Sequence, residues 1–98
     1  MDKESVLKKL TQQRHFLKSY QVKAISLFGS VARGDEASGS DVDLLVEFEP
    51  TAQIGMFEFI RLRRELSQIL RCDVDLATPG SLHKSMKKDI LREAIRAA

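Results

Sequence analysis

Residues 22–48 read VKAISLFGSVARGDEASGSDVDLLVEF, and this stretch decides the fold. Its first part, residues 22–28, is an apolar run of ordinary strand length that stops at Gly29. Its last part, residues 41–48, alternates between two faces before Pro50. One face carries Val42, Leu44, Val46 and Phe48, and the other carries Asp41, Asp43, Leu45 and Glu47. The stretch therefore predicts two strands joined by a loop over 29–40, in which only 31–33 could form a helical turn.

The flanking sequence predicts helices and one more strand. Apolar residues at three- and four-residue steps predict helices over 5–20 and 54–70. Alternation over 71–77 predicts a short third strand with Asp73 and Asp75 on one face. A closing helix is expected after Thr78 or Ser81, with an apolar stripe formed by Leu82, Met86, Ile90, Leu91, Ala94 and Ile95. The expected order is α-β-loop-β-α-β-α, an α/β (α+β) arrangement.

Length and composition exclude several classes of protein. The 98 residues, 43% of them hydrophobic, suffice for one core, so residues 1–98 are expected to form a single domain. The 16 basic and 14 acidic residues nearly balance, so charge alone predicts no direct nucleic-acid binding. No apolar run is long enough for a bilayer, and no membrane partner is expected. The single cysteine, Cys72, excludes an intrachain disulfide and fits a reducing, cytoplasmic location.

Two carboxylates in the second predicted strand are the strongest candidates for chemistry. Asp41 and Asp43 leave the same face of the strand, with Cβ atoms roughly 6–7 Å apart. Converging carboxylates repel unless a cation lies between them, and hard oxygen ligands suit Mg²⁺ or Mn²⁺. The alternative is that both are merely solvated. Aspartate is a poor strand former, and its recurrence in the third strand favours a functional site.

Gly29-Ser30 lies where the first strand ends. Exposed backbone N–H groups and a hydroxyl at this point could approach phosphate oxygens, although a plain tight turn would need the same residue types. The P-loop and the dinucleotide-binding glycine motif are absent, and residues 41–47 lack the glycine and oxygen ligands of an EF-hand. An anion site beside a cation site is the remaining functional interpretation.

These residues together match a known pattern. Gly29-Ser30, ten residues, then Asp41-Val42-Asp43 resembles the signature of the DNA polymerase β-like nucleotidyltransferase superfamily. The segments 27–34 and 40–46 resemble its minimal nucleotidyltransferase branch, and the similarity extends over nearly the whole chain. The resemblance implies a small mixed β-sheet with helices packed on one side.

The resemblance also implies the site. Asp41 and Asp43 would bind two Mg²⁺ ions, and Asp75 would complete the second metal's shell and help to activate the attacking hydroxyl. Asp73 is the rival for this third carboxylate. The β- and γ-phosphates of ATP would be held by Gly29 and Ser30. Many relatives carry an arginine where this chain has Val31, so Arg33 is the nearest substitute.

The implied function is that of an Mg²⁺-dependent nucleotidyltransferase acting as the antitoxin of a helical HEPN-type ribonuclease. It would transfer AMP from ATP to a tyrosine of that toxin, in a hetero-oligomer with it. Two alternatives stay open: an antitoxin that neutralises by binding alone, and a small-molecule nucleotidyltransferase. The second ranks lowest, because no residues are expected to be left for the acceptor-binding domain of larger members. His15 and His83 are interpreted as solvated or helix-capping residues, not metal ligands.

Overall fold

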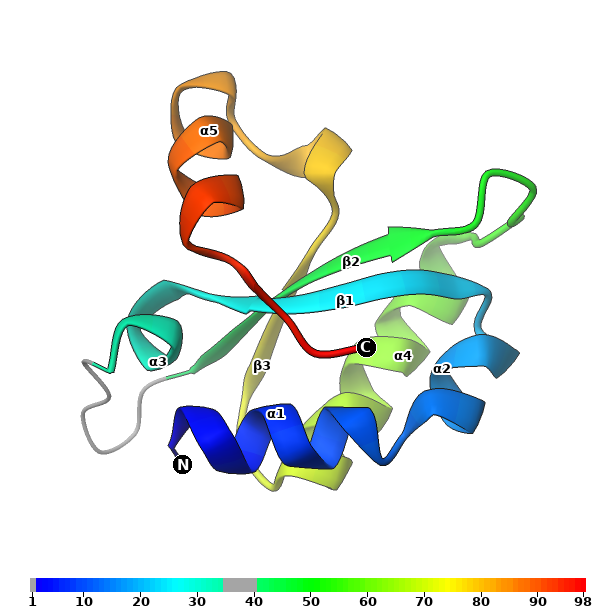
Figure 1. The fold of residues 1–98 in the computed structure, drawn as a ribbon. Helices are drawn as coiled ribbons and strands as arrows, with labels where there is room; N and C mark the ends of the chain where they lie inside the picture. The colour runs from blue at the N-terminus through cyan, green and yellow to red at the C-terminus, as the bar shows by residue number, and fades with distance from the viewer. Residues whose placement is uncertain (1, 35–40) are drawn as a thin grey trace.

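The computed structural model describes residues 2–34 and 41–98, and it contains a four-stranded mixed sheet (Figure 1). The strands are β1 (Val22–Phe28), β2 (Val42–Phe48), β3 (Val74–Ala77) and β4 (Ile95–Arg96), in the order β3-β2-β1-β4. β1 is antiparallel to both β2 and β4, whereas β2 and β3 are parallel. The mixed sheet and its helices confirm the expected fold class. The loop predicted over 29–40 is described only up to Gly34, and its remainder lies outside the described residues.

In the described residues, five α-helices and one short 3₁₀ helix pack around this sheet. They are α1 (Lys3–Thr11), α2 (Arg14–Ser19), α3 (Gly29–Arg33), α4 (Met56–Leu70), the 3₁₀ helix η1 (Pro79–Ser81) and α5 (Lys84–Glu93). None of the helices in the described parts of the chain is long and apolar enough to cross a membrane.

The single helix predicted over 5–20 is wrong, because the chain breaks at Gln12 and Gln13 between α1 and α2. The Gln13 N–H donates to the carbonyl of Leu10 at 3.0 Å, which tightens the turn, and Gln13 leaves the helical region at φ −104° and ψ 26°. Residues 11–15 contain no large apolar side chain, so burial does not stabilise a continuous helix there. Leu10 of α1 and Leu17 of α2 both lie in the core.

The main core lies between the sheet and helices α1, α2 and α4, which are below the sheet in Figure 1. Alternate strand residues supply its sheet side, as the pattern predicts: Val42, Leu44, Val46, Val74 and Leu76. The helices supply Val6, Leu10, Leu17, Leu62, Leu66 and Leu70. Leu45 and Ile90 are buried but lie outside this cluster. Helix α5 lies on the other side of the sheet, so the helices do not all pack on one side as expected (Figure 1).

The predicted closing helix is too long, and its apolar stripe is wrong. Helix α5 ends at Glu93, and Ala94 turns to extended backbone at ψ 135°. The chain then forms β4, in which Ile95 pairs with Leu27. Met86 and Leu91 are 57% and 46% exposed, whereas Ile90 is buried. The edge of β1 offers unpaired backbone groups, and a two-residue strand that satisfies them is too short to show a period in the sequence.

Candidate active site

Three predicted aspartates lie at one end of two neighbouring strands. The parallel register of β2 and β3 sets Asp43 directly beside Asp75. Asp41 immediately precedes β2, and alternation along the strand places it on the face of Asp43. Because the core-facing residues of these strands are Val42, Leu44, Val74 and Leu76, the aspartates face away from the main core. The fold therefore gathers the carboxylates that the sequence placed on two separate strands.

The electrostatics of Asp43 reflect this gathering. Partial burial raises the pKa of the Asp43 carboxyl above its ordinary value, and the negative charges of Asp75 and Asp41 raise it further. The Arg33 guanidinium acts in the opposite direction, and Glu93 adds to the rise. The positive charge of Arg33 does not offset the effect of burial and of the Asp75 and Asp41 charges on Asp43. A cation bound beside Asp43 would supply further positive charge.

The carboxylates are the donor type that Mg²⁺ prefers. In the described residues, however, no three His, Cys, Asp or Glu side chains are grouped closely enough to hold a metal ion. Asp41 and Asp75 are exposed, so their side chains have room to turn toward a shared ion. The donor chemistry and the repulsion at Asp43 therefore fit a divalent cation, with side-chain rotation needed to complete its shell.

Gly29 lies against Asp43. The antiparallel register of β1 and β2 pairs Phe28 with Asp43, so the next residue turns directly over the carboxylate. Gly29 has φ +79°, and a Cβ atom at this position would collide with Asp43 Oδ2 and lie 2.9 Å from its Cγ. Only glycine satisfies both conditions. Ser30 follows it in α3 and is partly buried, so the structure places Gly29 against Asp43 and Ser30 next to Gly29 in the chain.

A residue that the sequence analysis missed, Glu93, completes this cluster. The Gly29 N–H donates to Glu93 Oε1 at 3.1 Å, and Arg33 Nη1 donates to both Glu93 oxygens at 3.2 Å. Glu93 thus binds two of the groups predicted to hold phosphates. It is the last residue of α5 and more than sixty positions from Gly29, and no short-range pattern could have shown that the two would meet.

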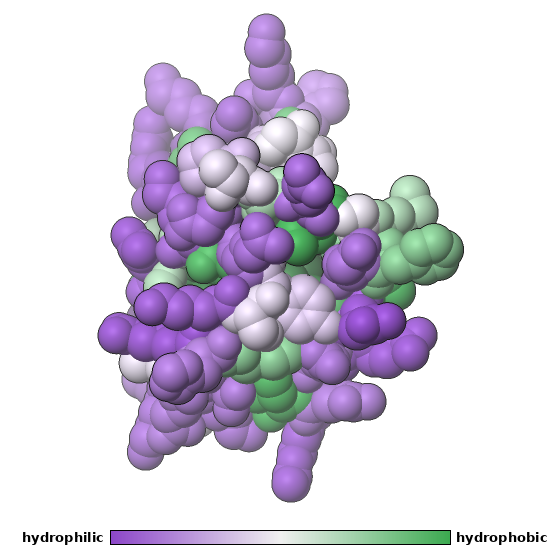
Figure 2. Space-filling model, turned by 90° about the vertical axis from the view of Figure 1, so that its right-hand side faces the viewer, coloured by the Kyte–Doolittle hydropathy of each residue, from purple (hydrophilic) through white to green (hydrophobic). Residues whose placement is uncertain are grey.

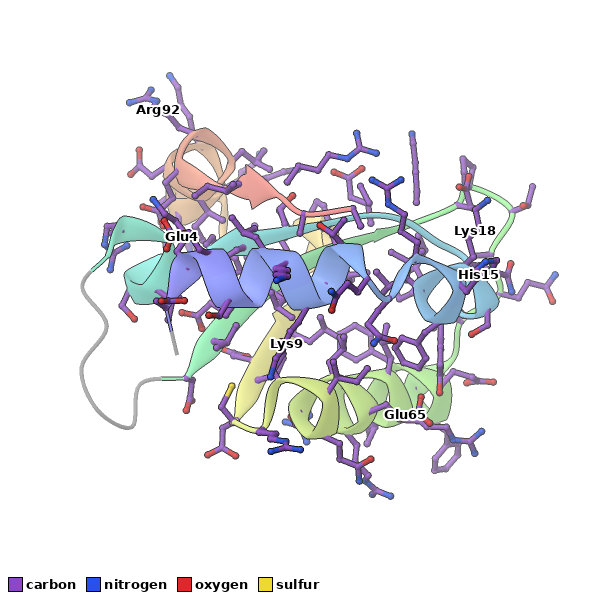
Figure 3. All side chains as sticks on the ribbon, turned by 60° about the horizontal axis from the view of Figure 1, so that its bottom comes forward. Glu4, Lys9, His15, Lys18, Glu65 and Arg92 are labelled. Carbon is purple, nitrogen blue, oxygen red and sulfur yellow. The ribbon has the colours of Figure 1, made fainter. Side chains whose placement is uncertain are left out.

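Asp73 lies beside Asp41 and not beside Asp43, and the two histidines lie outside the cluster. Asp73 precedes β3, and its carbonyl accepts from the Val42 N–H at 3.0 Å, whereas Asp75 is the residue in register with Asp43. His83 caps α5, since its Nδ1 accepts from the Ser85 N–H at 3.3 Å, and this confirms its predicted capping role. His15 is exposed on α2, at the opposite end of the molecule from α3 (Figure 3).

Comparison with known proteins identifies the family. The family model for the nucleotidyltransferase domain matches residues 7–97. The chain belongs to this family. It is therefore an enzyme of the nucleotidyltransferase class, as the sequence predicted. The match covers both the three aspartates and the residues of α5 that return to Gly29.

Individual nucleotidyltransferases are similar over almost the whole chain. Protein adenylyltransferase MntA of Thermococcus cleftensis is 35% identical over 92 residues, which cover 94% of this chain and 89% of that protein. MJ1379 of Methanocaldococcus jannaschii, provisionally named a protein adenylyltransferase, is 39% identical over 88 residues, which cover 84% and 88%. A solved minimal nucleotidyltransferase superposes with a TM-score of 0.80 at 32% identity and covers 97% of this chain and 95% of its own.

More distant structures share the fold. A toxin–antitoxin crystal structure with AMP-PNP has a TM-score of 0.74 at 21% identity, covering 94% of this chain and 72% of that one. The complex of a tri-AMPylated HEPN toxin of Shewanella oneidensis with its MNT antitoxin has a TM-score of 0.67 at 18% identity, covering 97% and 71%.

Proposed function

We propose that this nucleotidyltransferase is a protein adenylyltransferase that transfers AMP from ATP to a tyrosine of a HEPN-type toxin and thereby neutralises it. The observation that carries this proposal is the pairing of Asp43 with Asp75 beside Gly29. Such a site can bind a triphosphate through a divalent cation and orient its α-phosphate toward an acceptor. A single domain in the cytoplasm, where ATP is available, belongs to the same proposal.

The proposed reaction is an in-line displacement at the α-phosphorus. The tyrosine oxygen forms a bond to this phosphorus, the bond from it to the bridging oxygen of the β-phosphate breaks, and pyrophosphate leaves. The tyrosine proton passes to a carboxylate, for which Asp75 is the candidate, or to water. Asp41, Asp43 and Asp75 would hold two Mg²⁺ ions, which supply positive charge to the entering and leaving oxygens. Gly29, Ser30 and Arg33 would hold the β- and γ-phosphates.

The comparisons support the acceptor only by similarity. The T. cleftensis relative carries the name of a protein adenylyltransferase, and the HEPN toxin in the S. oneidensis complex is tri-AMPylated. AMP on a toxin adds a bulky anion, which would repel RNA from a nearby active site. Asp41 and Asp75 are exposed, so the side chain of a partner protein could reach the site.

The test is transfer of label from ATP to a HEPN-type partner encoded in the same host. The full chain, Mg²⁺ and the partner are incubated with α-labelled or γ-labelled ATP in parallel. Label on the partner from α-labelled ATP only is expected, because a kinase would transfer the γ-phosphate instead. Mass spectrometry then identifies the modified residue.

Controls separate catalysis from binding alone. The Asp41→Ala, Asp43→Ala double variant should lose label transfer while it still captures the partner. Unchanged neutralisation by this variant would replace the proposal with an antitoxin that acts by binding. Label on a small molecule and none on protein would favour a small-molecule nucleotidyltransferase.

A further inference from the structure

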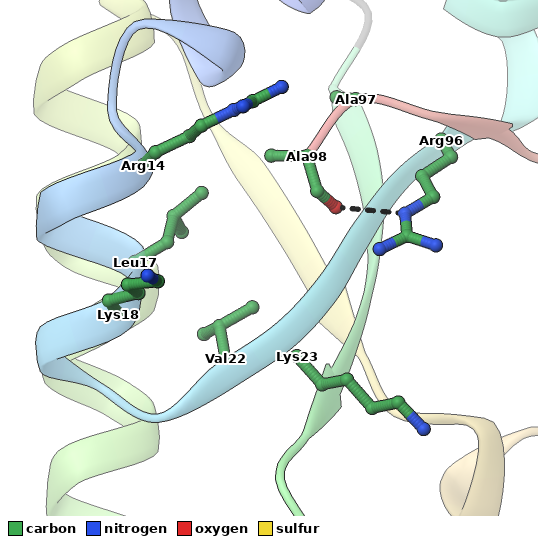
Figure 4. A pocket seen from close by; sticks show the side chains of 8 residues that line it. All are labelled: Arg14, Leu17, Lys18, Val22, Lys23, Arg96, Ala97 and Ala98. Carbon is green, nitrogen blue, oxygen red and sulfur yellow. Dashed lines mark hydrogen bonds between the residues drawn. The ribbon is translucent and has the colours of Figure 1, made fainter.

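A basic pocket lies at the opposite end of β1 from the aspartates. It has a volume of about 520 Å³ and is lined by Arg14, Leu17, Lys18, Val22, Lys23, Arg96, Ala97 and Ala98 (Figure 4). Val22, in the pocket lining, begins β1, and Gly29 follows the end of this strand, so these two residues are about 20 Å apart at ~3.3 Å per strand residue. The pocket is therefore separate from the proposed ATP site.

The topology of the sheet creates this pocket. β4 pairs with β1 only at Ser26 and Leu27, and the Ile25 N–H donates to the Ala98 carbonyl at 3.0 Å. β1 continues past this point to Val22, so its first residues extend beyond the part of its edge that β4 covers. Helix α2 closes the other side, and the space between α2 and residues 96–98 is the pocket (Figure 4).

Four of the eight lining residues are basic, and none is acidic. Arg14 and Lys18 are one turn apart on α2, and Arg96 faces them from the chain segment across the pocket (Figure 4). Arg96 is held there by a hydrogen bond from Nε to the Ala98 carbonyl at 3.3 Å. Within residues 2–34 and 41–98, no ion pair joins Arg14, Lys18 or Lys23 to a carboxylate. Four basic side chains around one pocket make it positively charged, and an anion bound there would gain from that charge.

The shape and the remaining lining point to the size of that anion. Leu17, Val22 and Ala97 provide an apolar floor, and the volume falls in the range of small-molecule sites, about 300–1,000 Å³. Guanidinium groups bind phosphate oxygens through two parallel hydrogen bonds, and lysines add point charges. The surrounding face, over α2 and the start of β1, is predominantly hydrophilic (Figure 2).

We propose that this pocket binds a small ligand that carries two or more phosphate groups, at a site distinct from the nucleotidyl-transfer site. A phosphodiester chain offers the same chemistry. A nucleic acid would, however, need basic residues along an extended groove, whereas here they surround a pocket. The small ligand is therefore the occupant that the geometry favours.

The experiment titrates the ¹⁵N-labelled full chain with sodium tripolyphosphate in EDTA and follows the amide resonances. Without divalent cations the three aspartates repel a polyanion, so binding at the active site is suppressed. Shifts are expected at residues 14–18, 22–24 and 96–98. Shifts centred on residues 29–33 instead would overturn the proposal.

A matched pair of variants tests the specificity. Arg14→Gln, Lys18→Gln removes two charges one turn apart on α2, and affinity should fall at least tenfold. Lys84→Gln, Lys88→Gln removes the same charge at the same spacing on α5, and affinity should change less than twofold. Equal losses would show non-specific attraction and overturn the site. Circular dichroism melts verify that both variants fold.

A single-stranded oligonucleotide with the same number of phosphates distinguishes the two sources. Weaker binding than tripolyphosphate at the same residues supports the small ligand. Tighter binding, lost in the Arg14→Gln, Lys18→Gln variant, would overturn it in favour of a nucleic-acid site.

Discussion

Gly29 and Asp43 are in such close contact that a side chain at position 29 would occupy the place of the Asp43 carboxylate. The contact follows from the register of β1 and β2, which pairs Phe28 with Asp43. It joins the predicted phosphate-binding residue to the predicted metal ligand through packing alone. The glycine and the aspartate are therefore expected to act as one unit.

Gly29→Ala tests this unit. Position 29 has φ +79°, which costs an alanine about 1–2 kcal/mol, and the collision with Asp43 adds to that cost. We expect the free energy of unfolding to fall by more than ~2 kcal/mol and AMP transfer to fall about 100-fold, since a 1 Å misplacement has that effect. Urea denaturation and the label-transfer assay measure the two quantities.

Gly34→Ala is the matched control. Gly34 has nearly the same angle, φ +78°, but a Cβ atom there meets none of the described residues within 4 Å. The free energy of unfolding of this variant should fall only by the cost of positive φ for an alanine, about 1–2 kcal/mol, and transfer activity should be retained. Equal effects of the two substitutions would mean that the contact with Asp43 is unimportant.

Asp75→Asn distinguishes the two candidates for the third carboxylate. Asp75 is in register with Asp43. Of the neighbouring charges, that of Asp75 raises the pKa of the Asp43 carboxyl most. Its loss should lower AMP transfer about 1,000-fold, equivalent to ~4 kcal/mol of transition-state stabilisation. Asp73→Asn, two residues earlier on the chain, should change the rate less than threefold. The opposite ranking in the α-label assay would make Asp73 the third carboxylate.

The sequence was sufficient for those parts of the fold that depend on local pattern. Both long strands, the α4 helix and the faces of Asp41, Asp43 and Asp75 follow from alternation and helical spacing. The Gly29-Ser30 turn could be placed because glycine ends an apolar run there. These elements position the candidate site, and for this reason the site could be proposed before the structure.

The parts that could not be predicted depend on contacts between distant residues. β4 exists because β1 has a free edge, and two residues carry no periodicity. The break at Gln12 and Gln13 depends on packing, because residues 11–15 contain no large apolar side chain that burial could use to stabilise a continuous helix. The bond of Glu93 to Gly29 requires α5 to fold back over α3, which no spacing within α5 reveals.

Stability should depend on pH through Asp43. The pKa of its carboxyl in the folded chain is raised above the ordinary value of 3.8, so the folded state binds more protons than the unfolded state between these two pKa values. Stability contributed by this group therefore falls as pH rises through that interval and stays low at neutral pH. Asp43→Asn should be more stable than the unsubstituted chain at pH 7 in EDTA, and the difference should shrink toward pH 4.

Urea denaturation from pH 4 to pH 7 measures this difference. Asp89→Asn, an exposed position in the middle of α5, serves as the control and should follow the unsubstituted chain at every pH. Added Mg²⁺ should stabilise the unsubstituted chain at pH 7 and have little effect on Asp43→Asn, since the cation offsets the repulsion. A constant difference across the pH range would show that Asp43 does not carry the effect.

Glu93→Gln tests whether an internal carboxylate competes with the phosphates of ATP. Glu93 accepts hydrogen bonds from the Gly29 N–H and from Arg33, which are the groups proposed to hold phosphate. Removing its charge should lower the Kd for a non-hydrolysable ATP analogue about threefold to tenfold, which is ~0.7–1.4 kcal/mol. The Arg33–Glu93 pair is substantially exposed, so the free energy of unfolding should fall by less than ~1 kcal/mol.

Isothermal titration calorimetry in the presence of Mg²⁺ measures the Kd for the ATP analogue. Asp89→Asn, one turn earlier on α5, is the control. The control should leave the Kd unchanged. Asp89→Asn removes the same charge from the same helix, but Asp89 is exposed and does not contact Gly29. Weaker binding by Glu93→Gln would instead show that Glu93 holds Gly29 and Arg33 in the conformation that ATP requires. In that case Glu93 is a positioning residue, and its hydrogen bonds to Gly29 and Arg33 persist when ATP binds.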